Sequence, residues 1–327
     1  MQTTSRVTST VTSDSYAKVI ANSKRVRWDI EDDVIRGRRF DLHKPFLPAG
    51  LSLAGELGFL SAADRRLFSQ VQGRSYACIF GMVERFISAK MLEIGRGHGL
   101  GDQIALEALV RMTDEEIKHQ ALFRRLEHLM AEDMPGGYRP AAEPNAVAVA
   151  VLGKSSWAVL ALTLHIELFT QAHYRASIAP ESSICPLWRD VFMFHWKEES
   201  QHAVLDELEF LNEDARLTPA QRDVAVDELI ELVGAVDQIL QAQAAFDAEY
   251  FLEAASARFA APQEAAIAAT LLKAYRWQYI VSGVMQPRFQ KVLFATMTPA
   301  QAARVNGALA PLLSAVPAEP SPIVAQG

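Results

Sequence analysis

A Glu-x-x-His pattern occurs twice in this 327-residue chain, at Glu116–His119 and at Glu199–His202. Residues three apart lie on one face of a helix, so each copy directs a carboxylate and an imidazole to the same side. Mixed carboxylate and imidazole ligands suit iron or manganese better than a metal that prefers thiolates. Two such pairs, completed by one Glu from each of two other helices, are the ligand set of a site for two metal ions.

Glu84 and Glu167 are the candidates for the two remaining carboxylates. Each lies in the apolar stripe of a predicted helix, where an unpaired ionised carboxylate is too costly to persist. Few Lys or Arg residues share these stripes, so we expect metal ions to supply the balancing charge. The interval from Glu84 to Glu116 is 32 residues, and the interval from Glu167 to Glu199 is the same. This repeat indicates two antiparallel helical hairpins that present their ligands at one depth.

A third histidine shares the face of the second motif. His195 lies four residues before Glu199 and seven before His202, so the three side chains follow one turn-spaced line on the helix. His195 is therefore a seventh candidate ligand. The alternative interpretation is a core histidine packed beside Phe192.

Two acidic residues and three aromatic residues are candidates for supporting roles. Glu115 and Glu198 each precede a ligand Glu, and we expect each to accept a hydrogen bond from the outward N–H of a ligand histidine. In the alternative interpretation, Glu115 and Glu198 are solvated charges on the helix surface. Tyr76, Phe123 and Tyr174 lie on the ligand stripes, one or two turns from a ligand, where they either line a substrate pocket or pack in the core.

The elements that must position these residues are helices, because apolar residues recur at spacings of three and four and no run alternates like a strand. We predict an all-α fold with a ferritin-like four-helix core over about 63–213 and accessory helices over about 218–315. The individual helices are expected at about 63–94, 102–132, 145–178, 186–212 and 218–256, with two more after Pro262 and Thr298. Residues 1–24 are expected to be disordered, residues 25–317 to form one domain, and residues 318–327 to be a loose tail.

Composition limits the possible partners and location. The formal net charge of −7 gives no basic surface for nucleic acid. The two cysteines do not indicate a disulfide framework, and the Ser/Thr-rich N-terminus lacks the apolar core of a signal peptide. The most apolar run, 146–164, contains Gly153 and Lys154 near its middle, which favours a core helix over a membrane span. We therefore expect a soluble, cytoplasmic protein without a membrane partner.

The ligand pattern resembles a known family of enzymes. The segments Asp114-Glu115-Glu116-x-x-His119 and His195-x-x-x-Glu199-x-x-His202 are similar to those of the di-iron N-oxygenases related to the p-aminobenzoate N-oxygenase. The resemblance covers roughly residues 70–210. It implies that two iron ions are held by the following residues: Glu84, Glu116, His119, Glu167, His195, Glu199 and His202.

The same resemblance implies an activity and its partners. Enzymes of this family hold O₂ as a peroxo-type species between two irons and oxidise a small-molecule amine to a hydroxylamine, nitroso or nitro product. No Rossmann or flavin signature is present, so we expect an external electron donor, either a ferredoxin or a separate reductase. Manganese is possible in place of iron, and we expect a homodimer.

Four alternatives share parts of the pattern. A di-iron desaturase or hydroxylase acting on an acyl chain or another small substrate has similar ligand spacing but no need for His195. The small subunit of ribonucleotide reductase usually has a radical tyrosine at the position occupied here by Phe123. The third alternative is an iron-storage or metal-binding structural protein without oxygenase activity, but storage cages are built from much shorter chains and have no place for the helices after Thr218. A degenerate bundle without metal does not explain the complete ligand set.

Overall fold

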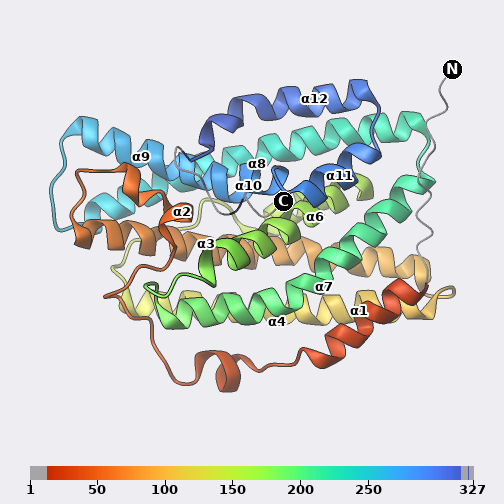
Figure 1. Cartoon of the computed structure of the whole chain (residues 1–327), viewed down its shortest axis with the longest axis horizontal. Helices are drawn as coiled ribbons and strands as arrows, with labels where there is room; N and C mark the ends of the chain where they lie inside the picture. The colour runs from red at the N-terminus through yellow and green to blue at the C-terminus, as the bar shows by residue number, and fades with distance from the viewer. Residues whose placement is uncertain (1–12, 318–322, 324–327) are drawn as a thin grey trace.

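The computed structural model describes residues 13–317 and residue 323, and within these residues it contains helices and no β-strand. The all-α prediction is confirmed. Four long helices form the core, namely α3 (Ala62–His98), α4 (Gln103–Asp133), α6 (Ser156–His173) and α7 (Pro186–Arg216). α3 packs along α4, and α6 packs along α7. The four run beside one another in Figure 1, so ligands from two hairpins can meet between them.

Local sequence signals explain where the helices begin. The Ser61 side chain accepts a hydrogen bond from the backbone N–H of Asp64 at the start of α3. Asp102 caps α4 through the N–H groups of Ile104 and Ala105. Each of these bonds satisfies a backbone donor that the first helical turn leaves without a partner.

The chain after α7 folds back over the core. Thr218 is the N-cap of the next helix and forms a capping box with Gln221. The helices that follow are α8 (Pro219–Ala254), α9 (Ala261–Arg276), α10 (Ser282–Val284), α11 (Pro287–Ala295) and α12 (Pro299–Leu309), with a π-helical turn over Trp277–Val281 between α9 and α10. α8 packs against α3 and α6, and α12 packs on α8. The short helix α11 was not predicted.

The predicted disorder of residues 1–24 is wrong for the part that the structure describes. Residues Ser13–Arg25 form α1, which packs against α4 and α7. Its buried residues are Tyr16, Val19, Ile20 and Ser23, which have the spacing of one helix face. A Ser/Thr-rich composition obscured this pattern. Residues 1–12 lie outside the described residues.

Two predicted helix boundaries are also corrected. The helix expected over 145–178 is divided into α5 (Pro144–Leu152) and α6 by a break at Gly153–Ser155, and it ends in a π-helical segment over Tyr174–Ile178. α3 continues to His98, past the Gly95 at which it was expected to stop. Gly95 is buried, and a Cβ atom added there would be in van der Waals contact with Leu106 of α4.

The remaining features concern the C-terminus and the apolar run. The predicted loose tail at 318–327 lies outside the described residues except for Ile323, which is buried. In the part of the chain that the structure covers, no helix has the length and apolar character needed to cross a membrane. The apolar run at 146–164 belongs to the two separate helices α5 and α6.

Candidate metal centre

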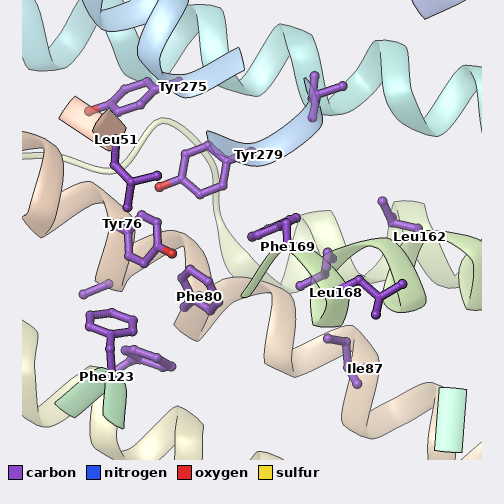
Figure 2. Close-up of a cluster of buried hydrophobic side chains, with 14 of the residues drawn as sticks. Leu51, Tyr76, Phe80, Ile87, Phe123, Leu162, Leu168, Phe169, Tyr275 and Tyr279 are labelled. Atoms are coloured by element: carbon purple, nitrogen blue, oxygen red, sulfur yellow. The ribbon is translucent and has the colours of Figure 1, made fainter. Parts of the chain in front are cut away.

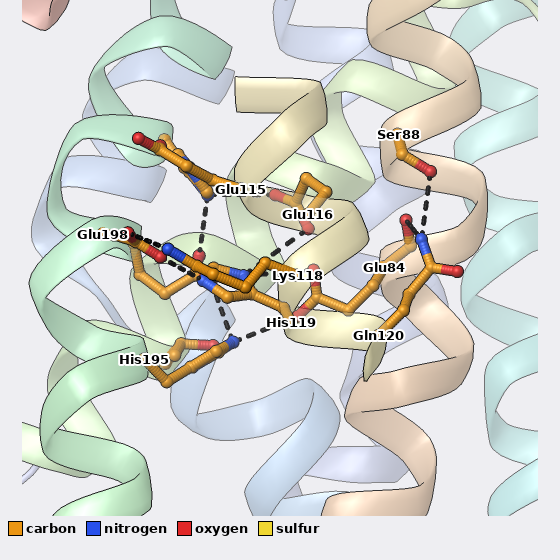
Figure 3. Close-up of polar contacts among 12 residues, drawn as sticks. Glu84, Ser88, Glu115, Glu116, Lys118, His119, Gln120, His195 and Glu198 are labelled. Atoms are coloured by element: carbon orange, nitrogen blue, oxygen red, sulfur yellow. Dashed lines mark hydrogen bonds and ion pairs between the residues drawn. The ribbon is translucent and has the colours of Figure 1, made fainter. Parts of the chain in front are cut away.

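Six of the seven predicted ligands converge between the core helices. They are Glu84 from α3, Glu116 and His119 from α4, and His195, Glu199 and His202 from α7. All six are at most 3% exposed, and Figure 3 shows members of the set pointing towards one another from different helices. Their ligand atoms form two groups, each within 4.8 Å: Glu84, His119, His195 and Glu199; and Glu116, His119, Glu199 and His202. His119 and Glu199 belong to both groups, so the two groups are adjacent. Two metal ions that share ligands must occupy adjacent positions of this kind.

Glu199 lies at the centre of the cluster. Its Oε1 atom is 2.9 Å from His195 Nε2 and 3.0 Å from His119 Nδ1. Its Oε2 atom is 3.4 Å from His202 Nδ1. Glu116 Oε1 is 2.9 Å from the same nitrogen of His202. A carboxylate with one oxygen towards each group is suited to contact two metal ions at once.

Several ligand atoms in this cluster are buried without a hydrogen-bond partner. They include both carboxylate oxygens of Glu116, Oε2 of Glu84, Oε1 of Glu199, and Nδ1 of His119 and of His202. An unsatisfied buried polar atom costs roughly 1–3 kcal/mol. A metal ion at the point towards which these atoms converge would satisfy several of them together. The residues present therefore fit a pair of metal ions.

The histidines and carboxylates of the cluster shift one another's pKa. Burial disfavours the charged imidazole of His119, but Glu198 and Glu199 outweigh burial and hold its pKa well above the usual value. The pKa of His202 is raised well above the usual value despite burial, chiefly by the charge of Glu199. Burial opposes ionisation of Glu199, yet the charges of cluster histidines hold its pKa well below the usual value. Metal ligation requires neutral imidazoles, so metal binding would displace any proton that the cluster histidines hold.

Glu115 and Glu198 occupy the supporting positions that the sequence predicts. Glu198 Oε2 is 2.9 Å from His119 Nε2, and Glu115 Oε2 is 2.8 Å from His202 Nε2. Each histidine therefore has its Nε2 atom fixed by a carboxylate while Nδ1 faces the cluster. Ser23 of α1 donates to Glu115 Oε1 at 2.6 Å, so the N-terminal helix helps to orient a ligand.

An aromatic cover over His119 was missed by the sequence interpretation. The Trp28 ring is stacked on the His119 ring, with centroids 6.0 Å apart and planes at 8°. The Lys118 ammonium lies 4.0 Å from the centroid of the Trp28 ring and 2.5 Å from a Glu198 oxygen. Trp28 belongs to the segment after α1, and no local pattern indicates which distant helix it covers.

The third histidine joins the cluster through one nitrogen. His195 Nε2 is 3.1 Å from Glu84 Oε1, and His195 Nδ1 is buried without a hydrogen-bond partner. Glu167 is 1% exposed but belongs to neither group of ligand atoms. Burial and then the neighbouring charge of Glu199 raise the pKa of Glu167 well above the usual value. Glu167 therefore lies beside the cluster and reaches it through Glu199.

Asp206 is a further buried acid next to the cluster that was not predicted. It is fully buried, and neither of its carboxylate oxygens has a hydrogen-bond partner. Burial raises its pKa to about 8. The signal was present in the sequence, because Glu199, His202, Asp206 and Glu209 follow one face of α7 at spacings of three and four.

The three aromatic residues predicted as pocket walls have different environments. The Phe123 ring lies 5.1 Å from the His195 ring, measured between centroids. Tyr76 is hydrogen-bonded to a histidine outside the cluster. Tyr174 stacks on Trp196, with ring centroids 4.8 Å apart. Phe123 thus adjoins the candidate ligands directly.

An apolar cavity of about 400 Å³ lies between α3, α5, α6 and α8. None of the three predicted pocket residues lines it. Phe80 does line it, and the Phe80 ring is 5.4 Å from the His195 ring. The cavity wall therefore touches the cluster at Phe80, a residue that the sequence analysis did not single out.

Two other buried histidines have ordinary structural roles. His165 Nε2 is 2.9 Å from the Ile280 carbonyl oxygen. Ser282 donates its own hydroxyl to a backbone carbonyl, so it accepts from His173 Nε2, and His173 Nδ1 accepts from Tyr76. Burial lowers the pKa of His165 to about 4 and that of His173 to about 3. Both are neutral near pH 7, and the two ring nitrogens of His173 are both satisfied.

The fold and the site together define an all-α bundle whose buried His/Glu cluster can hold a pair of metal ions. No family model matches the chain, and comparisons with curated proteins and with solved structures also gave no match.

Proposed function

We propose that this protein is an O₂-activating di-iron oxygenase that N-oxygenates an amine of a small molecule. The observation that carries the proposal is the position of His195, whose Nε2 lies 2.9 Å from Glu199 and 3.1 Å from Glu84 in a buried cluster. The resemblance drawn from the sequence assigns a third histidine to di-iron enzymes that oxidise amine nitrogen.

The bound iron pair would supply O₂ activation and oxidising power, and the protein's own residues would orient the ligands and exclude water. Glu198 fixes the ring orientation of His119 through Nε2. Phe80 and Phe123 place their rings against His195, and Trp28 covers His119. These rings exclude water from the ligands. Electrons would come from an external ferredoxin or reductase.

Replacement of His195 provides the test. The His195→Ala variant should retain most of its iron but lose oxidation of an arylamine probe, p-aminobenzoate, because the other ligands remain. Iron per chain and the hydroxylamine, nitroso and nitro products are measured on the same sample. His128→Ala is the matched control, since the His128 side chain is 66% exposed on α4. Full arylamine oxidation by His195→Ala would remove the N-oxygenase proposal.

A second candidate is a di-iron desaturase or hydroxylase that acts on an acyl chain. The apolar cavity next to Phe80 favours it, because hydrocarbon gains from transfer into such a space. The two candidates differ in product: reduced protein supplied with O₂ would give an alkene or alcohol from an acyl probe and no oxidised amine. Iron storage without oxygenase activity is the third and least supported candidate.

A further inference from the structure

The apolar cavity of about 400 Å³ extends from the outer surface of α5 to the neighbourhood of the metal cluster. Its outer lining includes Ala146 and Ala150 of α5, which are exposed. Its inner lining includes Phe80 and Phe169, which are buried and lie edge to face with ring centroids 6.2 Å apart. The Phe80 ring also lies edge-on to the ring of the candidate ligand His195, with centroids 5.4 Å apart. One aromatic ring therefore separates the inner end of the cavity from a candidate ligand.

The side chains that line this cavity favour an occupant without polar groups. Only Glu143 and Tyr279 among them carry a polar side chain. The Glu143 carboxylate accepts hydrogen bonds from two backbone N–H groups at the start of α5. Figure 2 shows the Tyr279 hydroxyl directed towards Leu51 and Tyr76, neither of which lines the cavity. An occupant with polar groups would therefore lose its hydrogen bonds to water without replacement.

This lining selects between the two molecules that the proposed reaction consumes. An arylamine such as p-aminobenzoate carries a charged carboxylate, and burial of that charge without a partner is costly. O₂ makes no such demand, and like other apolar molecules it transfers favourably from water into an apolar space. Cavities with apolar walls stay dry and bind apolar gases such as xenon. The cavity therefore suits O₂, and the amine must reach the cluster from another side.

We propose that this cavity admits O₂ and holds it beside the metal centre, and that Phe80 is the last side chain that O₂ passes. O₂ enters past Ala146 and Ala150, where the lining is exposed, and moves inward between apolar walls. Its passage to the cluster requires displacement of the Phe80 ring, which covers His195. The assignment rests on the proposed function, because it needs a metal centre that consumes O₂.

Methyl NMR of the iron-free, full-length protein under xenon pressure tests the gas site without any chemistry. The methyl signals of Ile79 and Ile166, which line the cavity, should shift with xenon pressure and reach saturation. Val147→Trp should abolish these shifts, because Val147 lines the cavity and the indole fills it. Val149→Trp is the matched control, since Val149 is 72% exposed on the same helix and does not line the cavity. Absence of saturable shifts in the wild type would overturn the proposal.

The same pair of variants tests whether O₂ uses the cavity. Protein loaded with ferrous iron is mixed with O₂ by stopped flow, and iron oxidation is followed by absorbance. The second-order rate constant of Val147→Trp should fall about tenfold at unchanged iron content, because O₂ must then displace packed side chains. Val149→Trp should react at the wild-type rate. Ile239→Trp, which fills the same cavity from α8, repeats the test independently of the folding of Val147→Trp. Equal rates in filled and control variants would overturn the assignment to O₂.

The outcomes also separate this proposal from the proposed function. Slower iron oxidation in Val147→Trp, together with no amine oxidation by the wild type, would reject the N-oxygenase and keep the O₂ route. Amine oxidation with equal O₂ rates in Val147→Trp and Val149→Trp would reject the route and keep the enzyme. Decane is the probe for a hydrocarbon occupant. If decane abolished the xenon shifts and were converted to an alkene or alcohol, the cavity would be an acyl-chain site, and the O₂ assignment would be overturned.

Discussion

Two buried carboxylate sites in this protein differ in how their charge is satisfied. Asp247 of α8 is fully buried. Its Oδ2 atom accepts from Ser75 Oγ at 2.5 Å and from the Tyr275 hydroxyl, and its Oδ1 atom accepts from Gln243 Nε2 at 3.0 Å. Glu116 is equally buried, but neither of its oxygens accepts a hydrogen bond, and its Oε1 atom instead lies 2.9 Å from His202 Nδ1 of the cluster.

The difference separates a structural site from a metal-binding one. Neutral donors on α3, α8 and α9 surround Asp247 and satisfy both of its oxygens without a metal ion. The metal cluster instead directs imidazole nitrogens and carboxylate oxygens to common points and leaves several of them without hydrogen bonds. Burial of acids alone therefore does not identify a metal site. A metal site is identified by buried carboxylate oxygens and imidazole nitrogens that lack hydrogen bonds and converge on common points.

The largest test of this comparison removes one carboxylate from each site. Glu199→Gln should lose both irons, about two per chain in the wild type by the di-metal ligand pattern, because Glu199 belongs to both groups of ligand atoms. Asp247→Asn should keep both. Iron is measured by plasma emission after reconstitution. Retention of two irons by Glu199→Gln, or their loss from Asp247→Asn, would break the comparison.

The next test uses pH at Asp247. Burial raises its pKa to about 7 from 3.8, against the opposing effect of its hydrogen bonds. The folded state therefore holds this proton more tightly than the unfolded chain does. The resulting stabilisation, about 4 kcal/mol for a pKa difference of about 3, is complete below about pH 4 and lost as the pH rises through 7.

Urea unfolding of iron-free protein between pH 4 and pH 9 measures this effect. The difference in unfolding free energy between the wild type and Asp247→Asn should decrease with rising pH, because the amide cannot ionise. A pH-independent difference would show that Asp247 is ionised throughout and that its network is not the neutral structural site described above.

The core of the site was predictable because its information is local. Each Glu-x-x-His pair is fixed by one turn of helix, and Glu84 and His195 continue apolar stripes that can be read from spacing. What the sequence analysis missed depends on contacts between distant segments. Trp28 over His119 and Ser23 on Glu115 join residues about 90 positions apart, and no periodicity reports such a pairing.

Two other features, helix α1 and the break between α5 and α6, had a local sequence signal, but the composition of the surrounding segment favoured a different prediction. The buried face of α1 has helical spacing within a Ser/Thr-rich segment. The break at Gly153–Ser155 lies inside the most apolar run of the chain, which suggested one continuous helix. That break gives α5 its own position as a wall of the apolar cavity.

The test with the smallest expected effect concerns Glu115 and Glu198, the carboxylates that contact the Nε2 atoms of His202 and His119. Glu115→Gln should keep the ligand set intact but weaken iron binding about 10- to 100-fold, the usual effect of losing such a partner. Glu115 accepts from His202 Nε2, and the bonds from His202 and Ser23 outweigh burial and lower its pKa to about 2. Its ionised form therefore holds the His202 ring with Nδ1 towards the cluster, and the neutral amide holds it less firmly.

Competition with a chelator of known affinity measures this change on the full-length protein. Ser23→Ala, which removes only the 2.6 Å bond to the other Glu115 oxygen, should weaken iron binding less than Glu115→Gln does. Glu132→Gln is the matched control, because Glu132 is on the same helix with a side chain 44% exposed. If Glu115→Gln bound iron as tightly as Glu132→Gln, the carboxylates behind the histidines would be structural, like the network around Asp247.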